Sequence, residues 1–301
     1  MTFFIQLVFA GLALGCIYAL VALGFTIIFK ASGVVNFAQG EFLLVGAYVA
    51  YVGVFDWHLN FFFALLIAIV VTVLIALVFE RFVLRPMIGR PIFAIIMITI
   101  GLNVILQTGA IVAGASSSLP PASPFQVSSI SNGINAGGIH FGTSDLWTIA
   151  VTIVCCAVLY IFFRFTRYGL AMRATALDQE AALAIGIDIR TIYALAWGIA
   201  AAIAVIGGVF LAISSGTFDS TLGNIALLAF PAIILGGLDS ILGAAVGGII
   251  IGVAEELTAG YEGNFAILGN GFHVIAPFLL MIIILLIRPY GLFGTRKVER
   301  V

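Results

Sequence analysis

Residues 61–80 read FFFALLIAIVVTVLIALVFE, a run in which the only charged residue, Glu80, stands last. A helix rising about 1.5 Å per residue crosses the hydrocarbon layer of a bilayer in around 20 residues. Three arginines follow closely, at Arg81, Arg85 and Arg90. An apolar run that ends in a group of cations predicts a transmembrane helix whose far end lies in the cytoplasm.

Runs of the same kind recur along the chain. They lie at 5–29, 38–55, 92–114, 146–165, 191–213 and 272–288, and the stretch 225–259 holds two shorter runs broken at 236–240. The composition agrees, because 63% of the 301 residues are hydrophobic and 8% are charged, whereas a soluble domain carries about a quarter charged residues. We therefore expect an all-α polytopic membrane protein in which 1–301 form one transmembrane domain. About nine helices cross the membrane, or eight if 38–55 or 225–236 only dips into it.

The basic residues predict the orientation. With nine crossings, all twelve cations lie on one face: Lys30, Arg81, Arg85, Arg90, Arg164, Arg167, Arg173, Arg190, Arg288, Arg296, Lys297 and Arg300. The positive-inside rule makes this face cytoplasmic, so the N-terminus lies outside and the C-terminus inside. The first run has no basic residue before Lys30 and is longer than the apolar core of a signal peptide, so we expect a retained span.

The opposite face is expected to carry acidic residues and no basic ones. The external loops are expected to hold Asp56, Asp145, Asp219, Glu255, Glu256 and Glu262. The largest loop, 115–145, is rich in Ser, Gly, Pro and Asn, and we expect an irregular cap with room for a short hairpin rather than a separate domain.

One polar segment joins the first two apolar runs. Residues 32–41 read SGVVNFAQGE, with Asn36, Gln39 and Glu41 entering the membrane almost without a loop. Such groups are costly there unless they face a partner or a water-filled path. Asn36 with Gln39 three residues on also resembles a helix-capping box. Capping and lining a solute path are both open for these residues.

A second polar segment has the same layout. Residues 214–224 read SSGTFDSTLGN, including Thr217 and Asn224, and a short apolar run ending at Gly236 follows. The two segments lie on opposite membrane faces in the predicted topology. Paired interrupted helices of opposite orientation indicate an inverted-repeat transporter with a path near the midplane.

Glycines are frequent in the later spans. The residues Gly236, Gly237, Gly243, Gly247 and Gly248 form a break and a small-residue stripe. Small residues let membrane helices approach closely, so we interpret these glycines as packing positions. The alternative is that they widen a translocation path.

The cytoplasmic stretch between the fifth and sixth spans predicts a short helix over 175–185. Its small-residue face is Ala181, Ala182 and Ala184, and Gly186 is placed as a C-terminal stop. Such a helix can lie at the membrane interface or dock into a groove of a soluble partner.

The order Glu180-Ala181-Ala182-x-x-x-Gly186 resembles the EAA signature of ABC importer permeases, without its common Ile-x-Leu-Pro ending. The resemblance implies that 166–190 couples the permease to an ATPase. The coupling residues it implies are Arg173, Asp178, Glu180, Ala181, Ala182 and Gly186.

A further resemblance covers nearly the whole chain. Residues 36–41 (NFAQGE), Arg173-Ala174 with Asp178, 235–240 (LGGLDS), and 288–294 (RPYGLFG) are similar to the LivH branch of branched-chain amino acid permeases. This implies transport of branched-chain or related amphipathic amino acids across a bacterial inner membrane. Permeases for urea, amides and aromatic acids share the pattern.

The same resemblance implies the partners. They are a second homologous permease, two cytoplasmic ATPases that bind ATP and magnesium, and a periplasmic or extracellular solute-binding protein. The chain has no G-x-x-x-x-G-K-[ST] loop, so we expect no ATPase activity and no cofactor of its own. The net charge of −1 argues against a nucleic-acid partner, and Cys16, Cys155 and Cys156 lie in apolar runs without metal-ligand spacing.

Two other classes are weighed against this function. An ion-gradient carrier or channel would need ionisable residues within its spans, whereas the acidic residues are expected near span ends. An intramembrane enzyme would need a convergent catalytic set, whereas His58, His140 and His273 are scattered.

Overall fold

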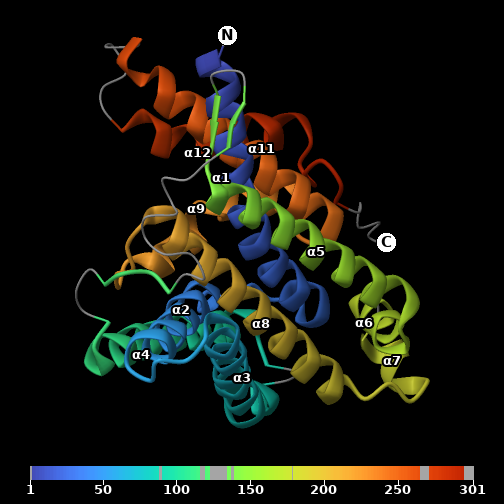
Figure 1. The fold of residues 1–301 in the computed structure, drawn as a ribbon. Helices are drawn as coiled ribbons and strands as arrows, with labels where there is room; N and C mark the ends of the chain where they lie inside the picture. Colours follow the sequence, from blue (N-terminus) through green and yellow to red (C-terminus); the bar gives the residue numbers. More distant parts are fainter. Residues whose placement is uncertain are drawn as a thin grey trace.

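The computed structural model describes residues 2–87, 90–115, 119–122, 134–136, 139–177, 179–264 and 271–294. The described chain is helical apart from one antiparallel hairpin in the external loop, formed by β1 (Ile134–Ala136) and β2 (Ile139–Phe141). The predicted all-α polytopic fold is therefore confirmed, and the external loop 115–145 contains a short hairpin, as the sequence allowed (Figure 1).

The helices follow the predicted runs. The α-helices are α1 (Thr2–Ser32), α2 (Gln39–Phe55), α3 (Phe61–Phe79), α4 (Ile92–Ala113), α5 (Thr143–Phe165), α6 (Arg167–Leu177), α7 (Gln179–Ala184), α8 (Ile189–Ser215), α9 (Ile225–Leu228), α10 (Phe230–Gly236), α11 (Ile241–Tyr261) and α12 (Phe272–Ile287). Short turns of other helix types are η1 (Glu80–Leu84), η2 (Arg85–Met87), η4 (Leu222–Asn224) and η5 (Glu262–Asn264).

Within the described chain, six helices are long and apolar enough to cross a membrane: α1, α3, α4, α5, α8 and α11. Three shorter apolar segments accompany them, at Gln39–Phe55, Leu222–Gly236 and Phe272–Ile287. The apolar stretch of α1 is 83% buried and that of α8 is 78% buried, against 17–28% for α3, α4 and α5. Two long helices thus form the centre, and the outer helices present apolar faces suited to lipid.

The packing of the helices is reciprocal between the two halves of the chain. Helix α1 packs on α11 as α8 packs on α3, and α2 packs on α8 as α10 packs on α1. Likewise α2 contacts α3 and α4, and α10 contacts α11 and α12. In Figure 1, α1 runs from the N-terminus toward α6, whereas α8 starts beside α7 and runs toward α9. This is the arrangement of the inverted repeat that the two broken segments predicted.

Some acidic residues do not lie in the loops where we expected them. Glu255 and Glu256 belong to α11 and Asp145 to α5. Glu255 is buried, and its Oε2 accepts a hydrogen bond of 2.6 Å from the Tyr18 hydroxyl on α1. A buried carboxylate is tolerated inside a helix when such a donor faces it, and the local sequence does not reveal the donor.

Candidate functional site

The link between α1 and α2 is built around Asn36, which is fully buried. Its Oδ1 accepts a hydrogen bond of 3.0 Å from the Ala38 backbone N–H, and its Nδ2 has no partner. Helix α2 starts at Gln39 without a side-chain cap. The capping box was therefore wrong: Asn36 closes a turn before the helix.

The side chain of Gln39 does not cap α2 but contacts the two central helices. Its Nε2 donates to the backbone oxygen of Ala200 on α8 (3.2 Å), and its Oε1 has no partner. The amide lies against Gly24 of α1, because a Cβ at Gly24 would stand 2.0 Å from Nε2. Gln39 thus joins the start of α2 to both central helices.

Glu41 brings the two interrupted segments together. It is buried, its Oε1 accepts from Asn103 Nδ2 on α4 (3.1 Å), and its Oε2 has no partner. A Cβ on Gly223 would lie 2.6 Å from Oε1, and one on Gly40 would lie 2.1 Å from the Gly223 oxygen. Glycine at both positions therefore allows the start of α2 to touch the loop before α9.

Two cavities flank this contact. The larger, of about 300 Å³, is lined by Asn36 and Thr99 together with residues from α1, α7, α8 and the start of α4. The smaller, of about 180 Å³, is lined by Phe37, Asn103 and Asn224 among others. We call them the large and the small cavity.

Phe37 lies between the two cavities. Its backbone N–H donates to Thr99 Oγ1 (3.3 Å), and its backbone oxygen accepts from Asn103 Nδ2 (3.4 Å). Its ring stacks on Phe230 at 5.7 Å, and Phe25 meets Phe230 edge-on at 5.3 Å. The link after α1 thus separates a cavity lined by Asn36 from one lined by aromatic rings and amides.

Thr217 does not lie at either cavity. It is exposed and is not among the residues that line either cavity. Its neighbour Phe218 is buried, exchanges two backbone hydrogen bonds with Leu119 of the external loop, and stacks near Tyr48 and Tyr51. The second polar segment therefore contributes Gly223 and Asn224 to the site, and its first part fastens the external loop.

Thr99 and Asn103 were not among the predicted site residues. Both belong to α4, a largely apolar helix, and both make hydrogen bonds to the α1–α2 link or to α2. A polar residue in mid-span is a signal in itself, and Asn103 could have been found by it.

The glycines that were predicted as packing positions lie where the backbones of two helices come close together. A Cβ on Gly236 would stand 2.1 Å from the Gly243 oxygen, one on Gly247 would stand 2.2 Å from the Ala232 oxygen, and one on Gly248 would stand 2.4 Å from the nitrogen of Ala19. These contacts join α10 to α11 and α11 to α1.

The C-terminal segment packs on the same turn. Gly237 has a φ of +103°, and a Cβ there would lie 2.5 Å from the Gly294 nitrogen. The N–H of Leu292 donates to Leu235 O (2.8 Å), and that of Phe293 donates to Gly236 O (3.1 Å). Two motifs far apart in sequence, 235–240 and 288–294, therefore form one unit.

The described residues of the predicted cytoplasmic helix belong to α6 (Arg167–Leu177) and α7 (Gln179–Ala184). Ala182 is buried while Ala181 and Ala184 are exposed, so the expected alanine face is split. Gly186 ends the helix as predicted: its φ is +85°, its N–H donates to Leu183 O, and the Ile187 N–H donates to Ala182 O.

Several residues of this segment face outward. Arg173 is exposed, and Asp178 and the side chain of Glu180 lie outside the described residues. The exposed apolar side chains are Leu177 (89%), Leu183 (57%) and Ile185 (75%). We call these three the apolar patch, a feature that the alanine pattern did not predict.

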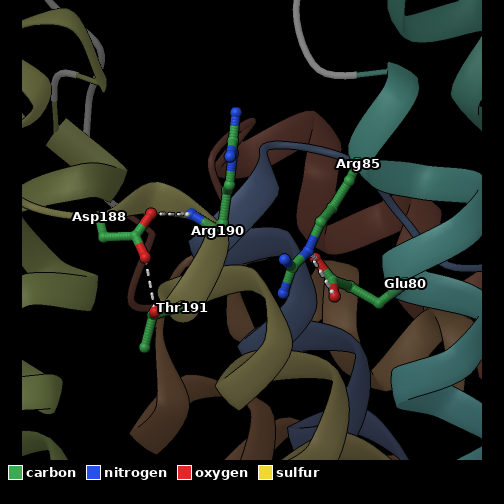
Figure 2. Close-up of polar contacts among 5 residues, drawn as sticks. All are labelled: Glu80, Arg85, Asp188, Arg190 and Thr191. Carbon is green, nitrogen blue, oxygen red and sulfur yellow. Dashed lines mark hydrogen bonds and ion pairs between the residues drawn. The ribbon is translucent and has the colours of Figure 1, made fainter.

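Figure 2 shows the polar contacts at the start of α8 and at the end of α3. Asp188 Oδ1 accepts from the Arg190 backbone N–H (3.1 Å) and Oδ2 from the Thr191 hydroxyl (2.7 Å), so that Asp188 caps α8. Glu80, buried at the end of α3, is paired with Arg85 at 3.0 Å across the π-helical turn η1. Arg85 thus compensates the one carboxylate of the α3 run.

Replacing Asp188 by alanine is expected to lower the free energy of unfolding by about 1 kcal/mol through loss of the cap. The hydrogen bond from Thr191 lowers the pKa of Asp188 below its ordinary value. The stabilisation is therefore present above an unfolded pKa of about 3.9 and is lost as pH falls through the lower folded pKa. Thermal unfolding in detergent, followed at several pH values, measures both the loss of stability in Asp188→Ala and its dependence on pH. Asp188→Asn keeps the cap at neutral pH, and an unchanged Asp188→Ala protein would contradict the assignment.

The fold and site define a class: a polytopic helical membrane protein with buried, unpartnered polar groups beside internal cavities. Within the described residues, no group of three His, Cys, Asp or Glu is placed to hold a metal ion. The family model of the permease component of branched-chain amino acid transport systems matches residues 7–286. The chain belongs to this family.

Relatives with this description are spread across bacteria and archaea. The chain is 32% identical to the high-affinity branched-chain amino acid transport system permease protein LivH of Salmonella typhimurium, over 99% of this chain and 98% of that protein. It is 30% identical to the permease protein BraD of Pseudomonas aeruginosa, with the same coverage. It is 29% identical to a probable LivH of Methanocaldococcus jannaschii, over 93% and 90% of the two chains. The prediction of a multi-pass transport permease of the LivH type is thereby confirmed.

Proposed function

We propose that the chain is the membrane subunit of an ATP-driven importer for branched-chain or similar amphipathic amino acids. The observation that carries this proposal is the row of buried side-chain atoms without partners at Asn36, Gln39 and Glu41. A buried polar atom without a partner costs about 1–3 kcal/mol. Thr26 in α1 and Thr72 in α3 also carry such atoms. The three side chains within residues 36–41 differ because they lie together where α1 is joined to α2, and there water or a polar solute meets them.

The path runs through the large and small cavities, past Phe37. Asn103 and Asn224 line the small cavity and offer amides to the charged ends of a zwitterion. Glu41 accepts a hydrogen bond from Asn103 and so orients its amide. Phe25, Phe37 and Phe230 offer apolar surface to an aliphatic side chain. This combination favours branched-chain amino acids over urea or small amides, which lack an apolar body.

In this proposal a second, homologous permease packs over the small cavity. Leu227 and Ile100 are exposed at its lining, and so is the amide of Asn224. An amide that faces lipid is costly, so the second permease covers this opening and completes the path.

The ATPases dock on the cytoplasmic segment. The apolar patch and Arg173 project from α6 and α7, and a groove on an ATPase buries the patch. ATP and magnesium are bound by two such partners, which leaves this chain without ATPase activity. The chain lies in the bacterial inner membrane, with its N-terminus outside and its C-terminus in the cytoplasm. An external binding protein delivers the solute to the outer face.

Purification in mild detergent, mass spectrometry of the associated chains, and an ATPase assay test this function. We expect two ATPases and a second permease, with ATP hydrolysis stimulated by a binding protein loaded with leucine. Uptake of labelled leucine should be inhibited by isoleucine and valine and not by urea. A chain that purifies alone and moves leucine without ATP would establish a secondary carrier instead.

Replacing Leu183 by aspartate is expected to reduce solute-stimulated ATP hydrolysis by about tenfold or more, because a charge in a buried apolar contact is strongly destabilising. The measurement is ATPase activity of the assembled complex, with recovery of the ATPases scored separately. Leu183→Met, which keeps an apolar side chain of similar size, is the matched control. Full activity of Leu183→Asp would exclude the apolar patch from the docking surface.

A further inference from the structure

Two hydrogen-bond donors that line the large cavity, on Asn36 and Arg90, are not used within the described residues. The Asn36 amide is oriented by the Ala38 N–H, which occupies Oδ1, so the unpartnered atom is the donor Nδ2. Arg90 lines the same cavity, and its guanidinium is in no ion pair within the part of the chain that the structure describes. Donors of this kind select an anionic oxygen.

The start of α4 adds to this preference. Ile92, the first residue of the 22-residue helix, lines the cavity, and the helix has no side-chain cap at its N-terminus. The first N–H groups of a helix lack partners within it and carry partial positive charge. A carboxylate held between Arg90 and Asn36 would therefore lie beside a favourable helix end.

The remaining lining is apolar. Ile28, Val34, Ile95 and Trp197 form much of the wall. The volume of about 300 Å³ is at the lower end of small-molecule pockets. A ligand with one carboxylate and a short aliphatic body matches this lining.

We infer that the large cavity is a binding site for a small aliphatic carboxylate that enters from the cytoplasm, with its carboxylate held by Arg90 and Asn36. This inference rests on the proposed function for the orientation and for one source of ligand, the imported amino acid accumulating inside. The other source is the 2-oxo acid made from it by deamination. Occupation of the cavity slows further import as the product accumulates.

The cavity also touches the predicted coupling segment. Gln179, the first residue of α7, lines it, and its Nε2 donates to the Tyr193 hydroxyl at 3.1 Å on α8. A ligand in the cavity therefore contacts the helix that carries Leu183 of the apolar patch. This contact gives the site a route to the ATPase surface.

The test uses Trp197 as the reporter, in the full-length chain with Trp57→Phe and Trp147→Phe, purified into lipid nanodiscs. The probes are leucine, 4-methyl-2-oxopentanoate and isoamylamine, which keeps the aliphatic body and lacks the carboxylate. Equilibrium binding of labelled leucine and labelled oxo acid is measured in parallel. This detects binding even if the fluorescence of Trp197 does not change.

We expect saturable binding of leucine, of the oxo acid or of both, and none of the amine. Arg90→Gln should raise Kd by about tenfold or more, because a hydrogen bond to a charged group is lost, and Arg90→Lys should restore most of the affinity. Arg81→Gln, a cation outside the cavity lining, is the matched control. Preference for the oxo acid would identify the deaminated compound as the ligand.

Binding of the amine with equal affinity, no binding of either acid, or unchanged affinity in Arg90→Gln would overturn the inference. Uptake of leucine by cells carrying the wild-type system is scored separately. Normal uptake without binding in the cavity rejects this site and leaves import intact. Absent uptake rejects the proposed function, while the titration still decides whether the cavity binds carboxylates.

Discussion

Replacing Glu41 by leucine is expected to reduce solute uptake by at least about tenfold while the protein remains folded. The carboxylate is buried, receives one hydrogen bond from Asn103, and leaves Oε2 without a partner. Asn103 Nδ2 keeps a second acceptor, the Phe37 backbone oxygen, so the substitution does not leave this donor without a partner and the fold is retained. If the free oxygen meets the solute in the path, transport loses that interaction. Initial rates of labelled leucine uptake, normalised to the folded protein, measure the effect.

Two variants separate transport from folding in this experiment. Glu41→Gln keeps the shape and an oxygen that can accept from Asn103, so we expect uptake between wild type and Glu41→Leu. Thr72→Val removes another buried oxygen without a partner, on α3 and with no hydrogen bond to a residue that lines either cavity, and it should leave uptake unchanged. Wild-type uptake by Glu41→Leu would place the carboxylate outside the path.

Replacing Gly248 by valine is expected to destabilise the folded protein by about 1–3 kcal/mol or more, the cost of overpacking. A Cβ there would stand 2.4 Å from the nitrogen and 2.6 Å from the Cα of Ala19. Both are backbone atoms, so α1 and α11 would have to separate. The measurement is the temperature at which the protein loses its monodisperse peak after heating in detergent.

The matched control lies on α4. A Cβ at Gly101 or Gly109 meets nothing within 4 Å, and glycine to alanine in a helix is mildly favourable. Gly101→Ala and Gly109→Ala should therefore match or slightly exceed wild-type stability. If Gly248→Val unfolds at the wild-type temperature, the α1–α11 contact is looser than the structure indicates.

Most of the fold could be predicted because its cause is local. A run of about twenty apolar residues predicts a membrane-spanning helix without reference to any other segment. The position of Glu255 could not be predicted in this way. A charge normally ends an apolar run, and the Tyr18 hydroxyl that allows the carboxylate inside lies 237 residues away in sequence.

The site was predicted in part for a similar reason. Asn36, Glu41 and Asn224 were found because polar groups in an apolar surrounding are conspicuous. The predicted capping box was wrong because the same residue types can also form a turn before the helix. The Gln39 amide donates to the Ala200 backbone oxygen on α8 instead of closing a capping box with Asn36. Thr217 was grouped with Asn224 by sequence proximity, yet the backbone pairing of Phe218 with Leu119 directs that part of the segment to the external loop.

The reciprocal packing of the two halves has a consequence for how the chain is made. Helix α1 leaves the ribosome first, yet its main packing partner, α11, comprises residues 241–261. Helix α2 likewise depends on α8, which is synthesised after the cytoplasmic segment. Membrane helices insert first and associate afterwards, so the N-terminal half waits in the bilayer with its glycine-lined surface uncovered. Native packing of the newly made chain is completed only when the second half arrives.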